Sequence, residues 1–323
     1  MKPIPTFSII MPTYQRRETV CDAVRALHGQ SYDGQIEIIV VVDGSTDGTA
    51  AALASIDGPF PMRIIEQENL GQAAARNRGA AEASGEILLF LDDDMICEPD
   101  MVEQHARMYR EGADAVAGNI PLHSDSPPGV LTDAVASSAT WEQRLHLSPL
   151  EIYAGQLSVR RSAFRALGGF DEEFCAGGSY GNDDVEFGAR LLRRFDVRHN
   201  PQAISRQLNL VTAREFMDRA SHLAAADIRL AAKHPELGRR LFLHRAERRS
   251  RSQRLTYRIL SASPAVAALL ASAMVRVCGV ALQTRFRSSP LLARAFIGAS
   301  SIAYWSNVRK LAGPAVVRES LRL

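Results

Sequence analysis

The chain has 323 residues, of which 46% are hydrophobic and 23% charged, a composition that fits a globular protein with a sizeable core. Its four cysteines show no paired spacing, which argues against a disulfide-rich secreted scaffold or a zinc module. Residues 1–202 carry 17 Lys and Arg against 30 Asp and Glu, whereas residues 203–323 carry 21 against 6. We therefore expect an acidic region that suits cations and a basic region that suits an anionic surface.

Short apolar runs alternate with helical stretches over the first ninety residues. Helical spacing indicates helices over 18–28, 49–56 and 69–84. The expected strands are Phe7–Met11, Ile36–Val42, Met62–Glu66 and Ile87–Leu91. This alternation predicts a largely parallel sheet with helices on both faces.

Three carboxylates follow the last of these strands directly, at Asp92, Asp93 and Asp94. Inside a core they would cost on the order of several kcal/mol unless cations neutralised them, so we expect the strand to end at a surface. Asp43 ends another strand, and right-handed crossovers place it at the same edge, where ligands bind in open α/β sheets. Such carboxylates suit Mg²⁺ bound together with substrate phosphates. The alternative is a solvated acidic turn.

The middle of the chain is less regular. We expect a helix over 99–110, a strand over 113–118, a long loop over 119–150 and a strand over 152–159. A short helix over 161–167 and a glycine-rich turn lead to Asn182, Asp183 and Asp184, which open a helix reaching about residue 194. The scattered histidines, His105 among them, are expected on the surface or in loops.

From Thr212 the sequence predicts helices to the end. Eight arginines lie within residues 239–258, ahead of an apolar stretch over 259–282 that Arg276 interrupts. Neither this stretch nor residues 291–305 forms a clean transmembrane span. A basic cluster beside apolar helices favours in-plane association with an anionic leaflet. The alternative is a helical subdomain that packs on the core or in a dimer.

Four segments together resemble the family 2 glycosyltransferases of the GT-A fold, over about residues 5–200. They are FSIIMPTYQR (Phe7–Arg16), IIVVVDGSTDGT (Ile38–Thr49), NLGQAAARNRG (Asn69–Gly79) and EILLFLDDD (Glu86–Asp94). The resemblance implies an α/β fold with a mixed, mainly parallel sheet flanked by helices. We expect a catalytic domain over 1–210 and a helical, Arg-rich region over 211–323.

The resemblance also implies roles for individual residues. Asp92 and Asp94 match the DxD motif that holds Mn²⁺ or Mg²⁺ against the diphosphate, where the metal acts as a Lewis acid. Asp184, beside Asp183, matches the general base that deprotonates the acceptor hydroxyl. The residues implied to bind the nucleotide-sugar are Pro12, Thr13, Tyr14, Arg16, Asp43, Asn69, Gly71, Arg76, Asn77, Asp92 and Asp93. Those implied on the acceptor side are Gly155, Gln156, Trp141 and Glu186.

The sequence departs from the family pattern at several positions. Val42 replaces an Asp, Asp183 replaces a Glu, Gln156 stands where an Asn is frequent, and Gln207 stands where many relatives carry a His. The last change puts a third metal ligand in doubt. The Gln-x-x-Arg-Trp signature of processive synthases is absent from the sequence, so we expect single-sugar addition.

The resemblance thus predicts an inverting transferase that moves one sugar from a nucleotide-diphospho-sugar, with a UDP-sugar expected, to a saccharide or lipid-linked acceptor. We expect a bacterial cytoplasmic protein, peripheral at the inner face of the membrane, that works in the synthesis of cell-envelope polysaccharide, glycolipid or another glycoconjugate. The alternative is an inactive relative that serves as a nucleotide-sugar-binding scaffold. Two other enzyme classes fit the sequence less well. A nucleotidylyltransferase would need a Gly-rich loop with a basic residue near the first strand. An aspartate-based phosphatase would need a residue with a hydroxyl group shortly after Asp94, where the sequence has Met95 and Ile96. Nucleic-acid binding is not expected, because the Arg-rich region lacks interleaved aromatic residues.

Overall fold

The computed structural model describes residues 4–127, 132, 147–175, 181–208, 212–247, 249–281 and 289–321. The chain divides into two units. Residues 1–125 and 139–208 form the first unit, and residues 126–138 and 209–323 form the second. The part of the predicted long loop around Trp141 and the glycine-rich turn at 177–180 lie outside the described residues.

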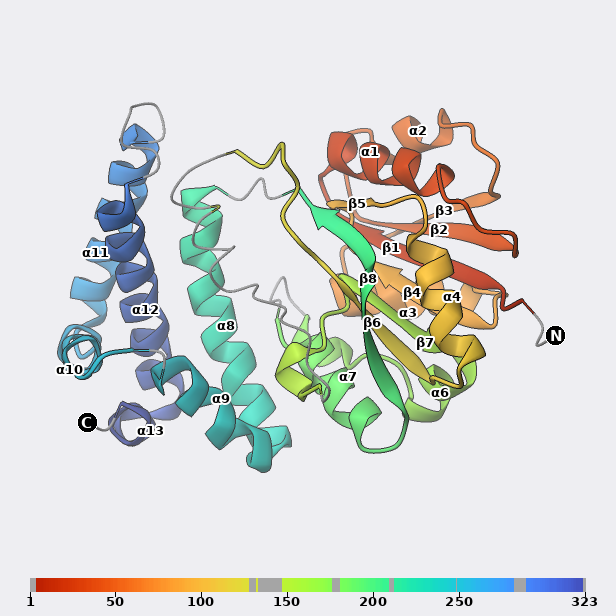
Figure 1. Cartoon of the computed structure of the whole chain (residues 1–323). Coiled ribbons are helices and arrows are strands. Elements are labelled where there is room, and N and C mark those ends of the chain that lie inside the picture. The colour runs from red at the N-terminus through yellow and green to blue at the C-terminus, as the bar shows by residue number, and fades with distance from the viewer. Residues whose placement is uncertain are drawn as a thin grey trace. The chain divides into compact units, whose positions relative to one another are not determined.

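An eight-stranded sheet in the order β3-β2-β1-β4-β7-β6-β8-β5 forms the centre of the described part of the first unit (Figure 1). The strands β1 to β4 pair in parallel, whereas β7 runs antiparallel to both β4 and β6. The fold is therefore the mixed, mainly parallel α/β sheet with flanking helices that the sequence predicts. The strands are β1 (Phe7–Thr13), β2 (Ile36–Asp43), β3 (Met62–Gln67), β4 (Ile87–Leu91), β5 (Met95–Cys97), β6 (Ala115–Asn119), β7 (Gln156–Arg160) and β8 (Val197–Gln207).

Helices cover both faces of this sheet. On one face Leu27 of α1, Leu53 of α2 and Val102 of α4 share a buried cluster with Ile9. On the other face, Phe164 of α6 and Phe187 of α7 join the alanines of α3 around the neighbouring Ile10. Strands buried on both faces need apolar residues at nearly every position, which explains the unbroken run of β4 and the largely apolar β1 and β2. The helices are α1 (Arg17–His28), α2 (Thr49–Ala54), α3 (Gln72–Glu82), α4 (Met101–Arg110), α6 (Arg161–Leu167) and α7 (Asp183–Leu192).

Some features of this unit differ from the sequence-based expectations. β7 begins at Gln156 rather than Ile152, because the chain turns at Ala154 and Gly155 directly before it. β8 is not predicted by the sequence pattern, because it carries a proline and several polar residues and is only partly buried. The expectation for His105 is wrong, since its side chain is fully buried between the sheet and α4 and contacts the Ser158 hydroxyl.

Six described helices make up the second unit, which confirms the predicted helical C-terminal region. Capping boxes at Thr212 with Glu215, and at Ser250 with Gln253, begin α8 and α10. Trp305 and Phe296 of α12 belong to two separate buried clusters. The helices are α8 (Ala213–Lys233), α9 (Pro235–Glu247), α10 (Arg251–Leu260), α11 (Pro264–Ala281), α12 (Pro290–Ala312) and α13 (Pro314–Ser320).

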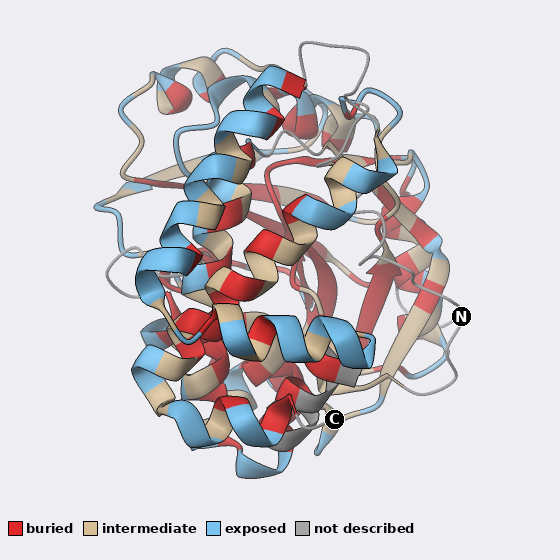
Figure 2. Cartoon of the chain, turned by 90° about the vertical axis from the view of Figure 1, so that its left-hand side faces the viewer, coloured by how far each residue is buried: buried red, intermediate tan, exposed pale blue. Residues whose placement is uncertain are grey.

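Among the described residues, α11 alone is long and apolar enough to cross a membrane by length and composition. Its mean hydropathy is 1.8, and 17% of the helix is buried. Figure 2 shows exposed residues along the helices of the second unit.

Candidate active site

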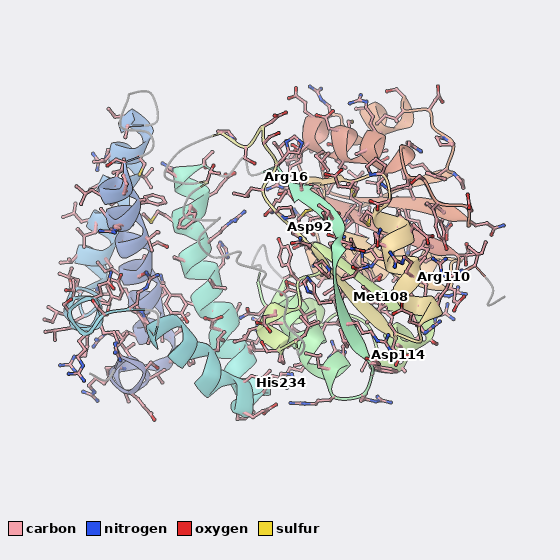
Figure 3. The ribbon with its side chains drawn as sticks, viewed as in Figure 1. Arg16, Asp92, Met108, Arg110, Asp114 and His234 are labelled. Carbon is pink, nitrogen blue, oxygen red and sulfur yellow. The ribbon has the colours of Figure 1, made fainter. Side chains whose placement is uncertain are left out.

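The carboxyl ends of β1, β2 and β4 lie side by side, because β1 pairs in parallel with the other two strands. This arrangement brings Asp43, which ends β2, to the same edge as the three acids that follow β4. It also brings in the segment after β1, which carries Arg16. Figure 3 labels Arg16 and Asp92 in this part of the sheet. The expected common edge is therefore present.

The three adjacent carboxylates are buried rather than solvated. Arg16 supplies one of the cations that make this possible, since its Nη1 lies 3.0 Å from Asp93 and 3.4 Å from Asp94. The Thr13 hydroxyl also donates to Asp93 at 2.8 Å. Burial nevertheless raises the pKa of Asp93 above its ordinary range. Thr13 and Arg16, both expected at the donor site, thus contact the acid cluster directly.

Arg76 supplies the second cation and links two distant parts of the chain. It lies on α3 with 2% of its surface exposed. Its Nη2 is 2.7 Å from Asp92, and its Nη1 is 2.7 Å from Asp183 at the start of α7. The guanidinium also lies over the Phe170 ring, 5.5 Å from its centre. A single buried arginine therefore holds the acids after β4 next to the acids that open α7.

Asp92 has further partners that the sequence did not reveal. The Gln72 side chain donates to Asp92 Oδ1 at 2.9 Å, and the Tyr153 hydroxyl donates to Oδ2 at 3.1 Å. Gly155 approaches so closely that a Cβ there would lie 2.9 Å from Asp92 Oδ2. A Cβ would also lie 2.3 Å from the Tyr153 ring, so any larger residue at this predicted acceptor-side position would displace the Tyr153 side chain. No spacing or motif marks Tyr153, which the fold alone brings to Asp92.

Asp94 is the member of the acid cluster whose hydrogen-bonding capacity is least satisfied by the described residues. Its Oδ2 accepts from Gln207 Nε2 at 3.2 Å, whereas its Oδ1 is buried without a hydrogen-bond partner among the described residues. Burial, together with the neighbouring Asp92 and Asp93, raises the pKa of Asp94 to about 7. Gln207, the residue in place of the expected histidine, therefore contacts the carboxylate at which a metal is expected.

Asp184 is partly buried at the first turn of α7. Its carboxylate accepts from the backbone N–H of Val185 at 2.8 Å. Burial and the adjacent Asp183 raise the pKa of Asp184 to about 7. Asn182 enters the helix in the left-handed conformation, with φ of 63°. A carboxyl group with this pKa can exchange a proton near neutral pH.

Asp43 binds the neighbouring backbone. Its carboxylate accepts from the N–H groups of Leu70 and Gly71 at 2.9 and 2.8 Å, and from the Gln67 side chain at 2.7 Å. Gly71 has φ of 93°, and a Cβ there would lie 2.4 Å from the carbonyl oxygen of Cys175. These contacts fix the start of α3, the helix that carries Arg76.

The remaining residues that were expected to bind the nucleotide-sugar have varied surroundings. Tyr14 is exposed just after the buried Pro12, and Asn69 packs with its backbone against Gly44. Asn77 contacts the backbone of Phe170 and the Glu172 side chain. Trp141 lies outside the described residues.

Two residues expected on the acceptor side point into the protein. Gln156 is 1% exposed and donates to the carbonyl of Ala203 beside His105. Glu186 is fully buried and paired with Arg190 at 2.5 Å. Their interactions stabilise the sheet and α7.

The acid cluster fits a divalent metal only with help from a ligand. The described residues contain no group of three or more His, Cys, Asp or Glu side chains that could hold a metal ion. Asp94 does offer a buried oxygen without a partner, and a cation there would relieve the repulsion within the cluster. Mg²⁺ commonly binds through one or two carboxylates and completes its shell with water and substrate phosphates. The residues present fit that kind of site.

Comparison with solved structures defines the class of fold. The mannosyltransferase PcManGT from Pyrobaculum calidifontis, solved in complex with GDP-Man and Mn²⁺, has a TM-score of 0.55 at 20% identity, over 93% of this chain and 87% of that one. TarS of S. aureus has a TM-score of 0.53 at 19% identity, over 93% of this chain and 55% of that one. The fold is that of the GT-A glycosyltransferases.

The sequence comparison shows which family the first part of the chain resembles. Residues 8–153 match the model of glycosyl transferase family 2, so this segment is similar to members of that family. Validoxylamine A glucosyltransferase of Streptomyces hygroscopicus subsp. limoneus is 29% identical over 275 residues, which are 74% of this chain and 59% of that protein. The putative glycosyltransferase EpsH of Bacillus subtilis (strain 168) is 36% identical over 145 residues, 44% of this chain and 41% of that protein. The chain spans less than two thirds of the length of these relatives.

Proposed function

We propose that the protein is an inverting glycosyltransferase that moves one sugar from a nucleotide-diphospho-sugar to an acceptor hydroxyl. The observation that carries the proposal is the placement of Arg76, within 2.7 Å of both Asp92 and Asp183. This contact joins a carboxylate group suited to a metal-bound diphosphate to a second carboxylate group suited to proton abstraction. The match of residues 8–153 to glycosyl transferase family 2 supports the same reaction class.

The donor side of the proposed site is the edge formed by β1, β2 and β4. We assign the nucleotide to the segments at Pro12–Tyr14 and Asp43–Gly44, and the diphosphate to the neighbourhood of Asp92 and Asp94. A divalent ion held by Asp94 and Asp92 would stabilise the negative charge that grows on the departing diphosphate. The Mn²⁺ and GDP-Man in the PcManGT structure support a metal and a nucleotide-sugar here. Arg16, beside Asp93 and Asp94, adds a positive charge to the same edge.

The acceptor side is the start of α7. We assign Asp184 as the general base, since its raised pKa keeps it basic enough to take the proton of the acceptor hydroxyl. Arg76 acts through Asp183, which it holds in place beside that base. Direct displacement at the anomeric carbon then inverts the configuration. The proton ends on Asp184, and the nucleoside diphosphate leaves.

We also propose a division of labour along the chain. Residues 1–210 would carry transfer, and residues 211–323 would attach the protein to an anionic membrane at the cytoplasmic side. The excess of Lys and Arg beyond residue 203 supports this division. A UDP-sugar donor and a lipid-linked or saccharide acceptor of the cell envelope are the partners we assign.

A turnover assay that follows release of nucleoside diphosphate with Mn²⁺ and a panel of donors and acceptors tests the proposal. Wild-type protein should release nucleoside diphosphate in proportion to glycosylated product, and the product should have inverted anomeric configuration by NMR. Asp184→Asn should lose turnover yet still bind donor. Donor binding without turnover on any acceptor would instead indicate a nucleotide-sugar-binding module.

A further inference from the structure

The C-terminal helices combine exposed apolar residues with a one-sided charge. From Arg248 to Arg318 the sequence carries eleven Arg, one Lys and no Asp or Glu. Within the described part of this stretch, α11 is buried over only 17% of its length. A soluble surface ordinarily mixes both signs of charge and keeps large apolar side chains scattered. This region does neither, so it fits a partner that is both anionic and apolar.

One face of α11 carries the apolar residues. Val266, Leu269, Ala273, Val277 and Val280 recur every three or four positions and are all exposed, Leu269 at 64% and Val280 at 67%. We call this set the α11 stripe.

Leu291, at the start of α12, extends the α11 stripe. It is 76% exposed and borders the same surface hollow as Val277 and Val280. Arg276 lies at the edge of the stripe, and Arg294 is exposed one turn after Leu291. The apolar surface thus has cations at its margin, the arrangement of an interfacial helix.

The opposite face of α11 determines how it can meet a bilayer. Cys278 is buried together with Met217 of α8 and Phe296 of α12. α8 also exposes charged side chains, including Asp218 and Lys233. If α11 crossed the membrane, α8 would be drawn into the hydrocarbon with these charges, which is strongly unfavourable. An in-plane helix avoids this, because only the stripe enters the lipid.

A second copy of the chain is a poorer fit to the same surface. A twofold interface places each patch against itself. Here that would bring Arg276 and Arg294 of both copies together, with no acidic residue between 248 and 318 to pair with them. Anionic headgroups provide the missing negative charge.

We propose that the α11 stripe, with Leu291, lies in the plane of an anionic bilayer surface and inserts its apolar side chains below the headgroups, while Arg276 and Arg294 contact lipid phosphates. This inference deepens the membrane attachment proposed above by naming the element and its orientation. It does not depend on catalysis.

Vesicle flotation of the full chain tests the inference without donor or acceptor. Wild-type protein should float with vesicles of phosphatidylcholine and phosphatidylglycerol, bind pure phosphatidylcholine at least about tenfold more weakly, and be released by high salt. Equal binding to both vesicles would overturn the charge assignment. Retention after high salt and alkaline extraction would indicate a spanning helix and overturn the in-plane orientation.

Two sets of variants locate the surface. Val280→Asp combined with Leu291→Asp should lower vesicle binding at least about tenfold. The matched control is Leu311→Asp, an exposed leucine about 30 Å further along α12 than Leu291, which should leave binding unchanged. Arg276→Gln and Arg294→Gln should each weaken binding about fivefold, which corresponds to about 1 kcal/mol per arginine.

Other outcomes would refute the assignment of the α11 stripe as the membrane-binding surface. Unchanged binding by the double aspartate variant, or equal loss in Leu311→Asp, would overturn the assignment. A wild-type dimer that the double variant converts to monomer, measured by light scattering, would make the stripe a protein interface instead. Thermal unfolding of each variant checks that it is folded. Because no sugar transfer is measured, failure here leaves the transferase proposal standing, and failure of transfer leaves this inference standing.

Discussion

Replacing Arg76 by leucine is the most informative perturbation of the candidate site. The substitution removes the cation between Asp92 and Asp183 while keeping a good helix-forming residue in α3. Both carboxylates are nearly inaccessible to water, with side chains 12% and 5% exposed. Without Arg76, Asp183 loses its ion pair with that arginine, and Asp92 keeps the neutral donors Gln72 and Tyr153.

The expected cost follows from that burial. Removing one partner of a buried ion pair costs about 3–5 kcal/mol, because the other charge stays buried and uncompensated. In this site two carboxylates lose their cation, which increases the cost, whereas relaxation of the protein and entry of water reduce it. We therefore expect the free energy of unfolding to fall by about 3–5 kcal/mol in total. The matched control is Arg78→Leu on the same helix. Arg78 is 55% exposed and pairs with Glu82 at 3.2 Å, and the loss of such a surface pair costs at most about 0.5 kcal/mol.

Urea unfolding followed by circular dichroism measures both variants, with the slope against denaturant checked for two-state behaviour. A loss below about 1 kcal/mol for Arg76→Leu, or a loss equal to that of Arg78→Leu, would refute the claim that Arg76 neutralises two buried acids. Arg76→Lys should recover part of the stability, since it restores the charge but cannot reach both carboxylates with a planar fork.

Three further predictions follow from the geometry. Gly71→Ala should destabilise the protein by at least about 2 kcal/mol, because Gly71 has a positive φ and an added Cβ would collide with the carbonyl oxygen of Cys175. The control is Gly279→Ala, in open space on α11, which should be neutral or stabilising by up to about 1 kcal/mol. Equal effects of the two substitutions in urea unfolding would contradict this prediction. The pKa of Asp184, raised to about 7, predicts that kcat/KM falls about tenfold per pH unit below about 7, where the base is protonated, and levels off above it; a flat profile between pH 5 and about 8 would exclude Asp184 as the base. Asp94→Asn should abolish Mn²⁺ binding followed by calorimetry in the presence of nucleoside diphosphate, and unchanged affinity would exclude Asp94 as a ligand.

The same raised pKa values set a stability profile with a defined sign. Asp94 and Asp184 hold protons in the folded state at pH values where the unfolded chain has released them. The metal-free protein should therefore lose stability as the pH rises from about 4 to about 7. Thermal unfolding across this range, with and without Mn²⁺, measures the effect.

The alternation of apolar runs and helical segments was enough to predict the sheet and the shared edge of Asp43 and Asp92. Both depend on local periodicity and on the handedness of crossovers, which the sequence records directly. β8 was missed because a partly buried strand that contains Pro201, Asn200 and Arg206 has no apolar pattern.

The interior of the candidate site was less predictable. The resemblance placed Arg16 and Arg76 at the donor site, but nothing in the sequence indicated that these two arginines pair with the buried acids. Pairing across about one hundred positions, as between Arg76 and Asp183, depends on the packing of α3 against the start of α7. Glu186, close to the base in sequence, instead pairs with Arg190 four residues on in α7, a contact that the i,i+4 spacing alone could have indicated.

A thermal-shift panel of UDP-, GDP- and dTDP-sugars, each with and without Mn²⁺, tests the central claim most directly. At about 100 times its Kd, the correct donor should add about 2.7 kcal/mol to the free energy of unfolding. That stabilisation should require the metal and should disappear in Asp94→Asn. Absence of a metal-dependent shift with every donor, or an equal shift in Asp94→Asn, would contradict a nucleotide-sugar site at this edge of the sheet.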